Sequence, residues 1–206
     1  MSYQLVIVGP LETNCYLFFC SQTRECAVID PGAEAEKIFE AIASLDLKPI
    51  IILNTHGHVD HTGANLDLKE RYQIPIALHP GDLPLLEEYL QLELGLMLGA
   101  RPAPAPDHLL ADGEKIAVGE SFLQVIHSPG HSPGSVCFYT DHLLFAGDTL
   151  FSGGVGRTDL PGGSWKDLAH SLKARVMTLP DETVVLPGHG PKTTIGEERE
   201  SNPYLE

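Results

Sequence analysis

Positive charge is scarce in this sequence, which has 13 Lys and Arg residues against 28 Asp and Glu in 206 residues. Nucleic acids and anionic membranes are bound mainly through clustered Lys and Arg, so the formal net charge of −15 disfavours both as partners. An anionic substrate would have to be attracted locally, by a metal ion or by a single well-placed arginine.

Long apolar runs are also missing. The stretch "LELGLMLGA" is too short to cross a membrane and contains Glu93, and the N-terminal "MSYQLVIVGP" lacks the features of a signal peptide. We therefore expect a cytoplasmic protein with no membrane partner. The chain length and the absence of a long repeat predict a single domain over residues 1–206.

Cysteine is sparse, and no Cys-x-x-Cys pair is present. Cys15, Cys20, Cys26 and Cys137 lie mostly in apolar, strand-like sequence, which predicts buried reduced thiols. A Cys20–Cys26 disulfide across a hairpin is feasible in geometry but is disfavoured in a reducing compartment.

Two common catalytic patterns are absent as well. The glycine-containing stretches "GPLETN" and "GGVGRTD" lack the lysine of a phosphate-binding P-loop. The serines near His131 do not occur in Gly-x-Ser-x-Gly, so the strained turn that presents a catalytic serine in many hydrolases is missing.

Strands and helices alternate along each half of the chain. Apolar residues at helical spacing predict helices at 33–47, 64–72, 82–98 and 164–179, of which 82–98 is the longest. Short apolar runs predict strands at 3–8, 14–20, 26–30, 48–53, 74–78, 115–118, 122–127, 135–140, 142–148 and 183–186. The Pro-rich stretch 99–110 is interpreted as a surface excursion. This alternation predicts a layered α/β protein with mixed sheets.

Metal-ligating side chains follow four of the predicted strands. "IIILNTH" runs into the His-rich stretch "THGHVDHTG", and "FLQVIHSPGH", "LLFAGD" and "VVLPGH" each end in a His or an Asp. Loops that leave strand ends converge on one site in α/β sheets, so these side chains are expected to share a pocket. The candidate ligands are His56, His58, Asp60, His61, His131, Asp148 and His189.

The number of these ligands indicates more than one metal ion. A catalytic zinc typically takes three protein ligands, whereas seven suit two ions with three ligands each and one bridging carboxylate. Histidines and aspartates without cysteine fit two divalent ions, Zn²⁺ first, with Fe²⁺ or Mn²⁺ as alternatives. The remaining histidines are interpreted as structural: His79, His108, His127, His142 and His170.

The order "THGHVDHTG", "PGHSPGS", "FAGDTLF" and "PGHGP" resembles the metallo-β-lactamase superfamily of binuclear hydrolases. Within it, "VIDPG", "GDTLFSGGVGRTDLPGG" and "GHGPKTTIGEERESNPYL" are similar to the short, single-domain glyoxalase II (hydroxyacylglutathione hydrolase) branch. The resemblance runs from "NCYL" to the C-terminal end of the sequence.

The resemblance implies a four-layer αβ/βα sandwich of two mixed β-sheets flanked by helices. It also implies a division of the ligands. His56, His58 and His131 would hold the first metal, Asp60, His61 and His189 the second, with Asp148 bridging both.

The implied reaction is hydrolysis of a small-molecule thioester such as S-lactoylglutathione. Water between the metals, with its pKa lowered toward about 7, would attack the acyl carbonyl. Asp60 would orient this nucleophile in addition to binding metal. Asp30 is either an acceptor for the N–H of a ligand imidazole or a turn-forming residue of "DPG".

Arg157 is the candidate anchor for a substrate carboxylate, and an ion pair with Asp159 that stabilises the loop is the equal alternative. Asp159 stands where the branch has an aromatic residue, and Pro191 stands where it often has Tyr. The additional C-terminal helical domain of full-length glyoxalase II, which supplies basic residues for glutathione, is not expected here. The thiol half of the substrate therefore stays open.

Other members of the superfamily fit less well. True β-lactamases resemble the chain at His-x-His-x-Asp but usually lack a His at the position of His61, and many have Cys at the position of Asp148. The acidic composition disfavours the tRNA-processing nucleases.

Two further functions remain as alternatives. "GRTD" also resembles the persulfide dioxygenase branch, an oxidoreductase that uses one Fe²⁺ and O₂, for which His56, His58, His131 and Asp148 would matter. A metal-dependent binding protein without activity would need an occluded or incomplete ligand set, and the set here is complete.

Overall fold

The first half of the chain folds into a mixed sheet in the computed structural model, which describes residues 1–205. Its strands, in spatial order, are β1 (Ser2–Val8), β2 (Thr13–Phe19), β3 (Glu25–Ile29), β4 (Lys48–Leu53), β5 (Ile76–Leu78) and β6 (His108–Leu109). The first three pair antiparallel, whereas β3 to β6 are parallel. The parallel pairs place the carboxyl ends of β4 and β5 at one edge, where their loops lie close together.

The second half forms a second sheet. Its strands, in spatial order, are β14 (Thr193–Thr194), β13 (Val184–Pro187), β10 (Leu143–Gly147), β9 (Val136–Thr140), β8 (Ser121–His127) and β7 (Lys115–Val118). Only β10 and β13 are parallel among these strands of residues 1–205. A small ribbon of β11 (Leu150–Phe151) and β12 (Gly154–Val155) follows β10.

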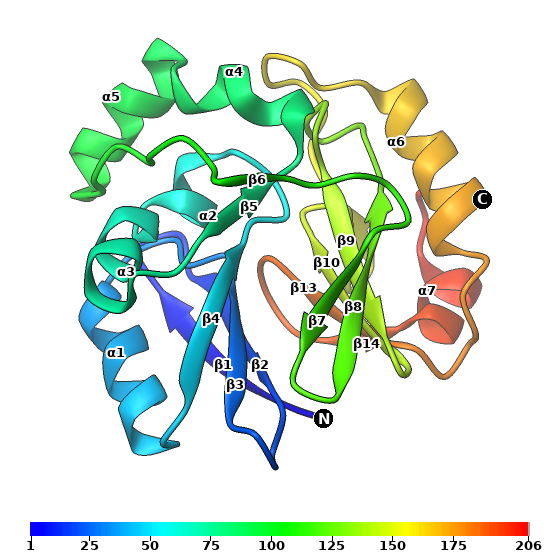
Figure 1. The fold of residues 1–206 in the computed structure, drawn as a ribbon. Coiled ribbons are helices and arrows are strands. Elements are labelled where there is room, and N and C mark those ends of the chain that lie inside the picture. Colours follow the sequence, from blue (N-terminus) through cyan, green and yellow to red (C-terminus); the bar gives the residue numbers. More distant parts are fainter. Residues whose placement is uncertain (206) are drawn as a thin grey trace.

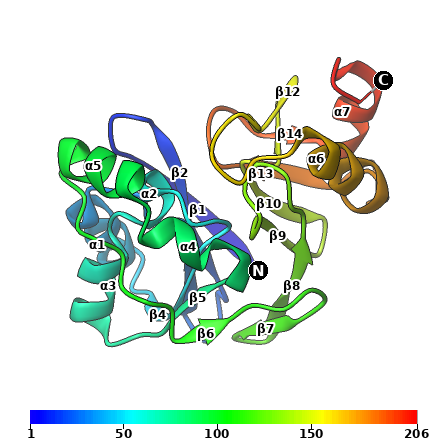
Figure 2. The same ribbon diagram turned by 90° about the horizontal axis from the view of Figure 1, so that it is seen from above.

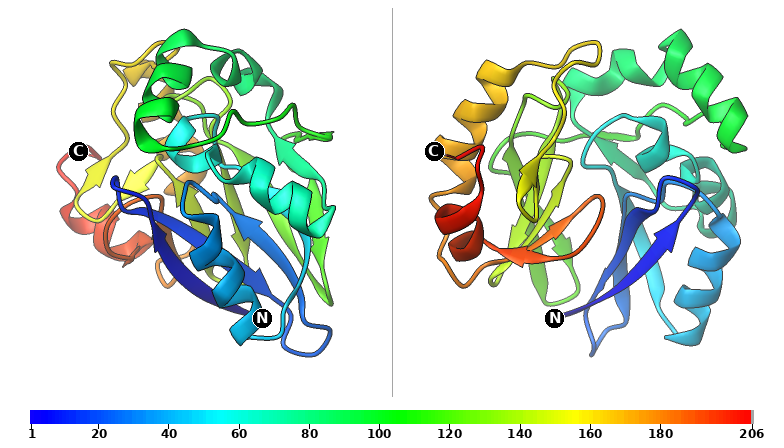
Figure 3. Two further views of the ribbon diagram at one scale, coloured as in Figure 1. Left: turned by 90° about the vertical axis from the view of Figure 1, so that its left-hand side faces the viewer. Right: turned by 180° about the vertical axis from the view of Figure 1, so that it is seen from behind.

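Helices cover the outer faces of both sheets, so the molecule has four layers (Figures 1 and 2). Seen from behind, α6 and α7 flank one side and α1 the other (Figure 3). The helices are α1 (Ala35–Ser44), α2 (Val59–Thr62), α3 (Asn65–Tyr72), η1 (Pro80–Asp82), α4 (Leu83–Leu86), α5 (Tyr89–Leu98), α6 (Trp165–Ser171), the π-type turn η2 (Leu172–Val176) and α7 (Ile195–Ser201). The expected αβ/βα sandwich of two mixed sheets is confirmed. None of the helices within residues 1–205 is long and apolar enough to cross a membrane.

Strand β2 shows how the sequence builds these layers. Successive side chains of a strand point to opposite faces. Leu17 packs in the core under α1 and α3, whereas Tyr16 and Phe18 pack in the core between the sheets. Every residue of β2 is therefore buried. A third core fills the space between the second sheet and α6, η2 and α7. The four cysteines are buried and free, as expected for reduced thiols.

The single long helix expected at 82–98 is wrong, because the segment forms two helices. Helix α4 tightens at its end, where the N–H of Glu87 bonds to Pro84 and that of Glu88 to Leu85, each with i to i+3 spacing. Glu88 then has an extended backbone, with φ −69° and ψ 131°, and α5 starts in a new direction. The helix expected at 164–179 similarly passes into the π-type turn at Leu172.

Candidate metal centre and active site

The candidate ligands leave the carboxyl ends of four strands. His56 and His58 lie in the loop after β4, and Asp60 and His61 lie in the short helix α2 that follows. The other three come from the second sheet, after β8, β10 and β13: His131, Asp148 and His189. The site therefore lies where the ends of the two sheets meet, as the strand-end pattern predicted.

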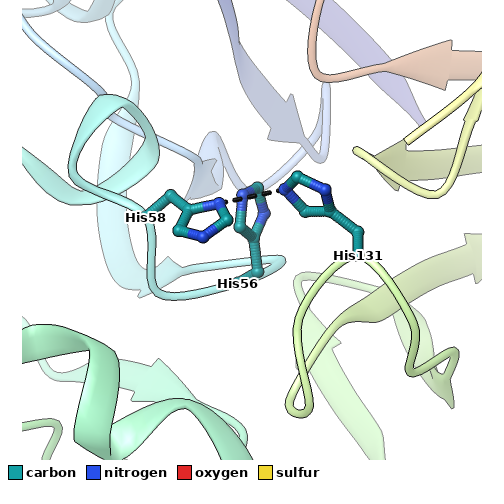
Figure 4. Close-up of side chains that lie close together, drawn as sticks. All are labelled: His56, His58 and His131. Atoms are coloured by element: carbon teal, nitrogen blue, oxygen red, sulfur yellow. Dashed lines mark hydrogen bonds between the residues drawn. The ribbon is translucent and has the colours of Figure 1, made fainter. Parts of the chain in front are cut away.

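The structure brings all seven side chains together. Among residues 1–205, three groups have ligand atoms within 4.8 Å of one another: His56, His58 and His131; Asp60, His61 and His189; and His56, His61 and Asp148. In Figure 4 the three imidazoles of the first group converge, with His58 Nδ1 2.9 Å from His131 Nε2. The two histidine sets expected from the sequence thus form two neighbouring groups, with Asp148 between them.

Hydrogen bonds from Nδ1 to backbone carbonyls orient two of the imidazoles. His131 Nδ1 lies 2.8 Å from the carbonyl oxygen of Arg157, and His189 Nδ1 lies 3.0 Å from that of Leu11. A carbonyl only accepts, so Nδ1 carries a proton in both rings, and in the neutral form of each ring Nε2 keeps its lone pair. The lone pair is what a metal ligand requires.

A relay of three residues, Asp30, Thr55 and His56, orients the imidazole of His56 in a similar way. The backbone N–H and the hydroxyl of Thr55 both donate to Asp30, at 2.7 Å each. With its hydrogen committed to Asp30, the Thr55 hydroxyl accepts from His56 Nδ1 at 3.0 Å. Asp30 Oδ2 also lies 3.1 Å from His61 Nδ1, so this carboxylate lies next to a ligand imidazole, and its role as the acceptor of that N–H stays a prediction.

Unpaired buried atoms at the centre fit a cation. His56 Nε2, His58 Nε2 and Asp148 Oδ1 are buried and have no hydrogen-bond partner in the part of the chain that the structure describes. Burial, followed by neighbouring imidazoles, lowers the pKa of His56 well below its ordinary value and that of His58 to about 3. Both rings are therefore neutral at pH 7, which is the state that binds metal.

The side of the site nearest Asp60 favours positive charge. Burial alone would lower the pKa of His61, but Asp60, Asp148 and Asp30 raise it to about 10. Burial likewise opposes ionisation of Asp60, yet His61 and His189 lower its pKa below the ordinary range. His61 Nε2 lies 3.6 Å from Asp60 Oδ2 and 3.4 Å from Asp148 Oδ1. The three carboxylates thus favour a cation at this side of the site, and a divalent metal ion bound there would take the place of the proton on His61.

Two glycines give the strand ends the space to approach one another. A Cβ on Gly188 would lie 2.3 Å from Asp148 Oδ1 and 2.7 Å from His61 Cε1. Gly147 has φ +48°, and a Cβ there would lie 2.3 Å from the Thr55 hydroxyl oxygen. Any larger residue at either position would push the groups of the centre apart.

Asp82, which the sequence patterns did not single out, joins two of the ligand loops. Its fully buried carboxylate accepts from Gly57 N at 2.9 Å, Ser132 Oγ at 2.6 Å and Gly134 N at 2.5 Å. Burial raises the pKa of Asp82, and these donors oppose the rise. Gly57 separates two ligands and Ser132 follows a third, so Asp82 fixes their loops relative to each other. Its sequence signal is weak, an Asp in "HPGD" just after a predicted strand.

A cavity of about 570 Å³ opens onto the ligands. Leu11, Leu94 and Pro161 contribute apolar surface, and the described lining residues outside the ligand set include the charged Glu88 and Arg157. Arg157 donates from Nε and Nη2 to the two carboxylate oxygens of Asp159, both at 2.8 Å. The ion pair weighed from the sequence is present, and a substrate role for Arg157 stays a prediction.

The five histidines interpreted as structural lie outside the three ligand groups found among residues 1–205. His79 and His127 stack on each other with ring centroids 4.0 Å apart.

Comparisons with known proteins agree with this geometry. A family model described as the metallo-beta-lactamase superfamily matches residues 8–189. The probable metallo-hydrolase YqgX of Bacillus subtilis is 38% identical over 100% of this chain and 98% of its own length. The hydroxyacylglutathione hydrolase GloC of Haemophilus influenzae is 35% identical, with the same shares covered.

Two solved structures are similar over nearly the whole chain. TTHA1623 in a di-iron-bound form has a TM-score of 0.89 and 44% identity, covering 98% of this chain and 100% of that one. The BLEG-1 B3 metallo-beta-lactamase has a TM-score of 0.90 and 38% identity, covering 99% of each chain. Similar chains thus carry names of different activities, so likeness alone does not give the substrate.

Proposed function

The chain belongs to the metallo-beta-lactamase superfamily, whose members are metal-dependent hydrolases, and from this premise we propose that it is a binuclear thioester hydrolase of the hydroxyacylglutathione hydrolase type. The relative named hydroxyacylglutathione hydrolase GloC, 35% identical over the full chain, supports this reaction class.

One observation carries the binuclear part of the proposal. His56, His58 and His131 form one group of convergent ligand atoms, and Asp60, His61 and His189 form another. Asp148 groups with one member of each set, His56 and His61, which suits a carboxylate that bridges two ions. A site for one ion would not need the second set.

The proposed division of labour follows from the side chains. When bound, two divalent ions would acidify water and polarise the acyl carbonyl. Asp60 stays ionised beside His61 and His189, so its carboxylate can accept a hydrogen bond from the attacking water and orient it. Hydrolysis adds the water oxygen to the acyl carbon and breaks the C–S bond, and one proton of the water ends on the thiol sulfur while the other leaves to solvent as the acid product ionises to a carboxylate.

The metal is proposed to be Zn²⁺, with Fe²⁺ and Mn²⁺ as alternatives, because imidazole and carboxylate ligands suit all three. The di-iron form of TTHA1623 makes iron the main competitor. Metal analysis of freshly purified protein is expected to give about two ions per chain. His189→Ala is expected to reduce this to about one, and the exposed control His142→Ala to leave it unchanged.

A substrate panel tests the reaction. S-lactoylglutathione and simpler thioesters form the panel, and hydrolysis of at least one of them by the metal-loaded protein is expected. A β-lactam belongs in the panel because a structural neighbour is called a B3 metallo-beta-lactamase. One iron per chain with thiol-dependent oxygen uptake would replace the proposal by the persulfide dioxygenase alternative. Absence of thioester turnover with both sites loaded would reject it.

A further inference from the structure

The charges of the substrate cavity differ from those that an anionic thiol would need. Beyond the metal ligands, the described residues that line the cavity include one permanent cation, Arg157, and one acid, Glu88. Apolar side chains supply much of the remaining surface, including Leu11, Leu94 and Leu160. The charge that a substrate meets outside the metal centre therefore depends on whether Arg157 is free.

Arg157 is not free, because Asp159 occupies its guanidinium. The two hydrogen bonds of 2.8 Å are parallel and bidentate, the geometry that a substrate carboxylate would otherwise adopt. Arg157 lowers the pKa of Asp159 to about 2, so Asp159 is ionised and neutralises the arginine at neutral pH. An anionic substrate would have to displace Asp159 from the pair.

Glu88 leaves a negative group without compensation. Its Oε2 atom is buried and has no hydrogen-bond partner among the side chains and backbone groups that the structure describes, although Glu88 lines the cavity. A buried carboxylate oxygen is costly to leave unpaired. Because Glu88 lines the cavity, its negative charge would attract a cationic group of the substrate and repel a second carboxylate.

We propose that Glu88 and Asp159 determine specificity by selecting thioesters whose thiol half is cationic or neutral and carries no carboxylate. This inference rests on the proposed thioester hydrolysis and narrows its substrate class: S-lactoylglutathione, whose thiol half carries two carboxylates, is expected to be hydrolysed more slowly than thioesters of neutral or cationic thiols. It also gives the break between α4 and α5 a role, since the extended backbone of Glu88 sets this side chain beside the cavity.

Three thioesters with the same propionyl group test the proposal. Their thiols are thiocholine, which is cationic, N-acetylcysteamine, which is neutral and offers an N–H donor, and 3-mercaptopropionate, which is anionic. At low ionic strength, kcat/KM for the cationic ester is expected to exceed that for the anionic ester about tenfold. The difference should shrink in about 0.5 M salt because the cavity is open to solvent.

Substitutions connect this preference to the two residues. Glu88→Gln should reduce the cationic-to-anionic ratio of kcat/KM about three- to tenfold, by removing one charge at nearly constant shape. Asp159→Asn should raise kcat/KM for the anionic ester by a similar factor, because Arg157 becomes available. Glu87→Gln is the matched control, since Glu87 is an exposed neighbour that does not line the cavity. The neutral ester normalises each variant for effects on the metal centre.

The outcomes separate the two proposals. Preference for the anionic ester in the unmodified protein overturns the inference, as does a Glu88→Gln effect no larger than that of Glu87→Gln. If no ester is hydrolysed, thioester hydrolysis is rejected, and the inference is judged by calorimetric binding of the S-methyl thioethers of the same thiols. Tighter binding of the cationic thioether that weakens in Glu88→Gln supports it, and tighter binding of the anionic one rejects it.

Discussion

Thr55 shows how a residue that touches no metal can define a ligand. Its hydroxyl donates to Asp30 and accepts from His56 Nδ1, which leaves His56 Nε2 facing the centre as an unpaired acceptor. Valine has nearly the same shape as threonine but cannot make either hydrogen bond. We expect Thr55→Val to weaken metal affinity about 10- to 100-fold, the usual effect of losing such a partner. Competition with a chromogenic chelator measures this.

The exposed Thr178 provides the control for this experiment. Its hydroxyl bonds to the carbonyl of Arg175 in a surface turn, so Thr178→Val should leave metal affinity unchanged. Equal affinities for Thr55→Val and the unmodified protein would show that the relay does not set the orientation of His56.

The functional residues that the sequence patterns identified differ physically from those that the patterns missed. The seven candidate ligands follow predicted strands and share one chemistry, so strand ends were enough to group them. Thr55 and Asp82 have no such signal, because each depends on a contact with a segment distant in the chain. Asp82 reaches Gly134, 52 positions away, and only the packing of the two sheets brings them together.

Asp82 connects two elements of the fold, because its hydrogen bonds join the loop after β4 to the loop after β8. Asp82→Asn would turn an amide NH₂ toward backbone N–H donors and leave at least one of them unsatisfied. We expect a loss of about 2–3 kcal/mol in the free energy of unfolding, measured in urea, together with weaker metal binding. The control Asp67→Asn breaks only an exposed ion pair with Arg101 and should cost under about 1 kcal/mol. Equal costs for the two variants would contradict the role of Asp82.

At the scale of elements, the sequence predicted whether a segment is a helix or a strand better than it predicted where the segment ends. Strands and helices were recovered where a regular apolar period ran uninterrupted, as in β1 to β4 and α1. The segment 82–98 was misjudged because its residues are so widely apolar that no stripe marks the break at Glu88. Helix α7 was missed, although Thr194 and Glu197 form a capping box, a signal readable in "TIGE".

The turn η1 makes stability depend on pH. His79 precedes it and accepts from Gly81 N through Nδ1, which requires a neutral ring. Burial, and then His127, lower the pKa of His79 to about 4 from an ordinary 6.5, against an opposite effect of Asp112. Between these values the unfolded chain binds more protons than the folded one, so the free energy of unfolding falls as pH falls from about 6.5 to about 4.

His79→Asn tests this dependence, because asparagine keeps an oxygen acceptor for Gly81 N but does not titrate. The free energy of unfolding, measured in urea between pH 7 and pH 4, should fall less steeply in this variant. His142→Asn, at an exposed position, should retain the full slope. An unchanged slope in His79→Asn would assign the acid sensitivity to other groups.

At the scale of the whole molecule, metal ions would act as a connection between the two sheets. Four candidate ligands follow β4 of the first sheet, and three follow strands of the second. The chain carries a net charge of −15, and the centre itself gathers Asp30, Asp60 and Asp148. Bound cations would therefore offset local repulsion between carboxylates at the same place where they join the two halves of the fold.

Removal of metal should accordingly lower the stability of the entire fold. A ligand present at 1,000 times its Kd stabilises the folded state by about 4 kcal/mol for each site. We expect dialysis against a chelator to lower the midpoint of thermal unfolding by several degrees, and Zn²⁺ to restore it. Asp148→Ala removes the carboxylate that groups with members of both sets, so in this variant the chelator should change the midpoint much less. If the unmodified protein unfolded at the same temperature with and without chelator, the ligand groups would not hold metal in the folded state, and the binuclear proposal would fail with them.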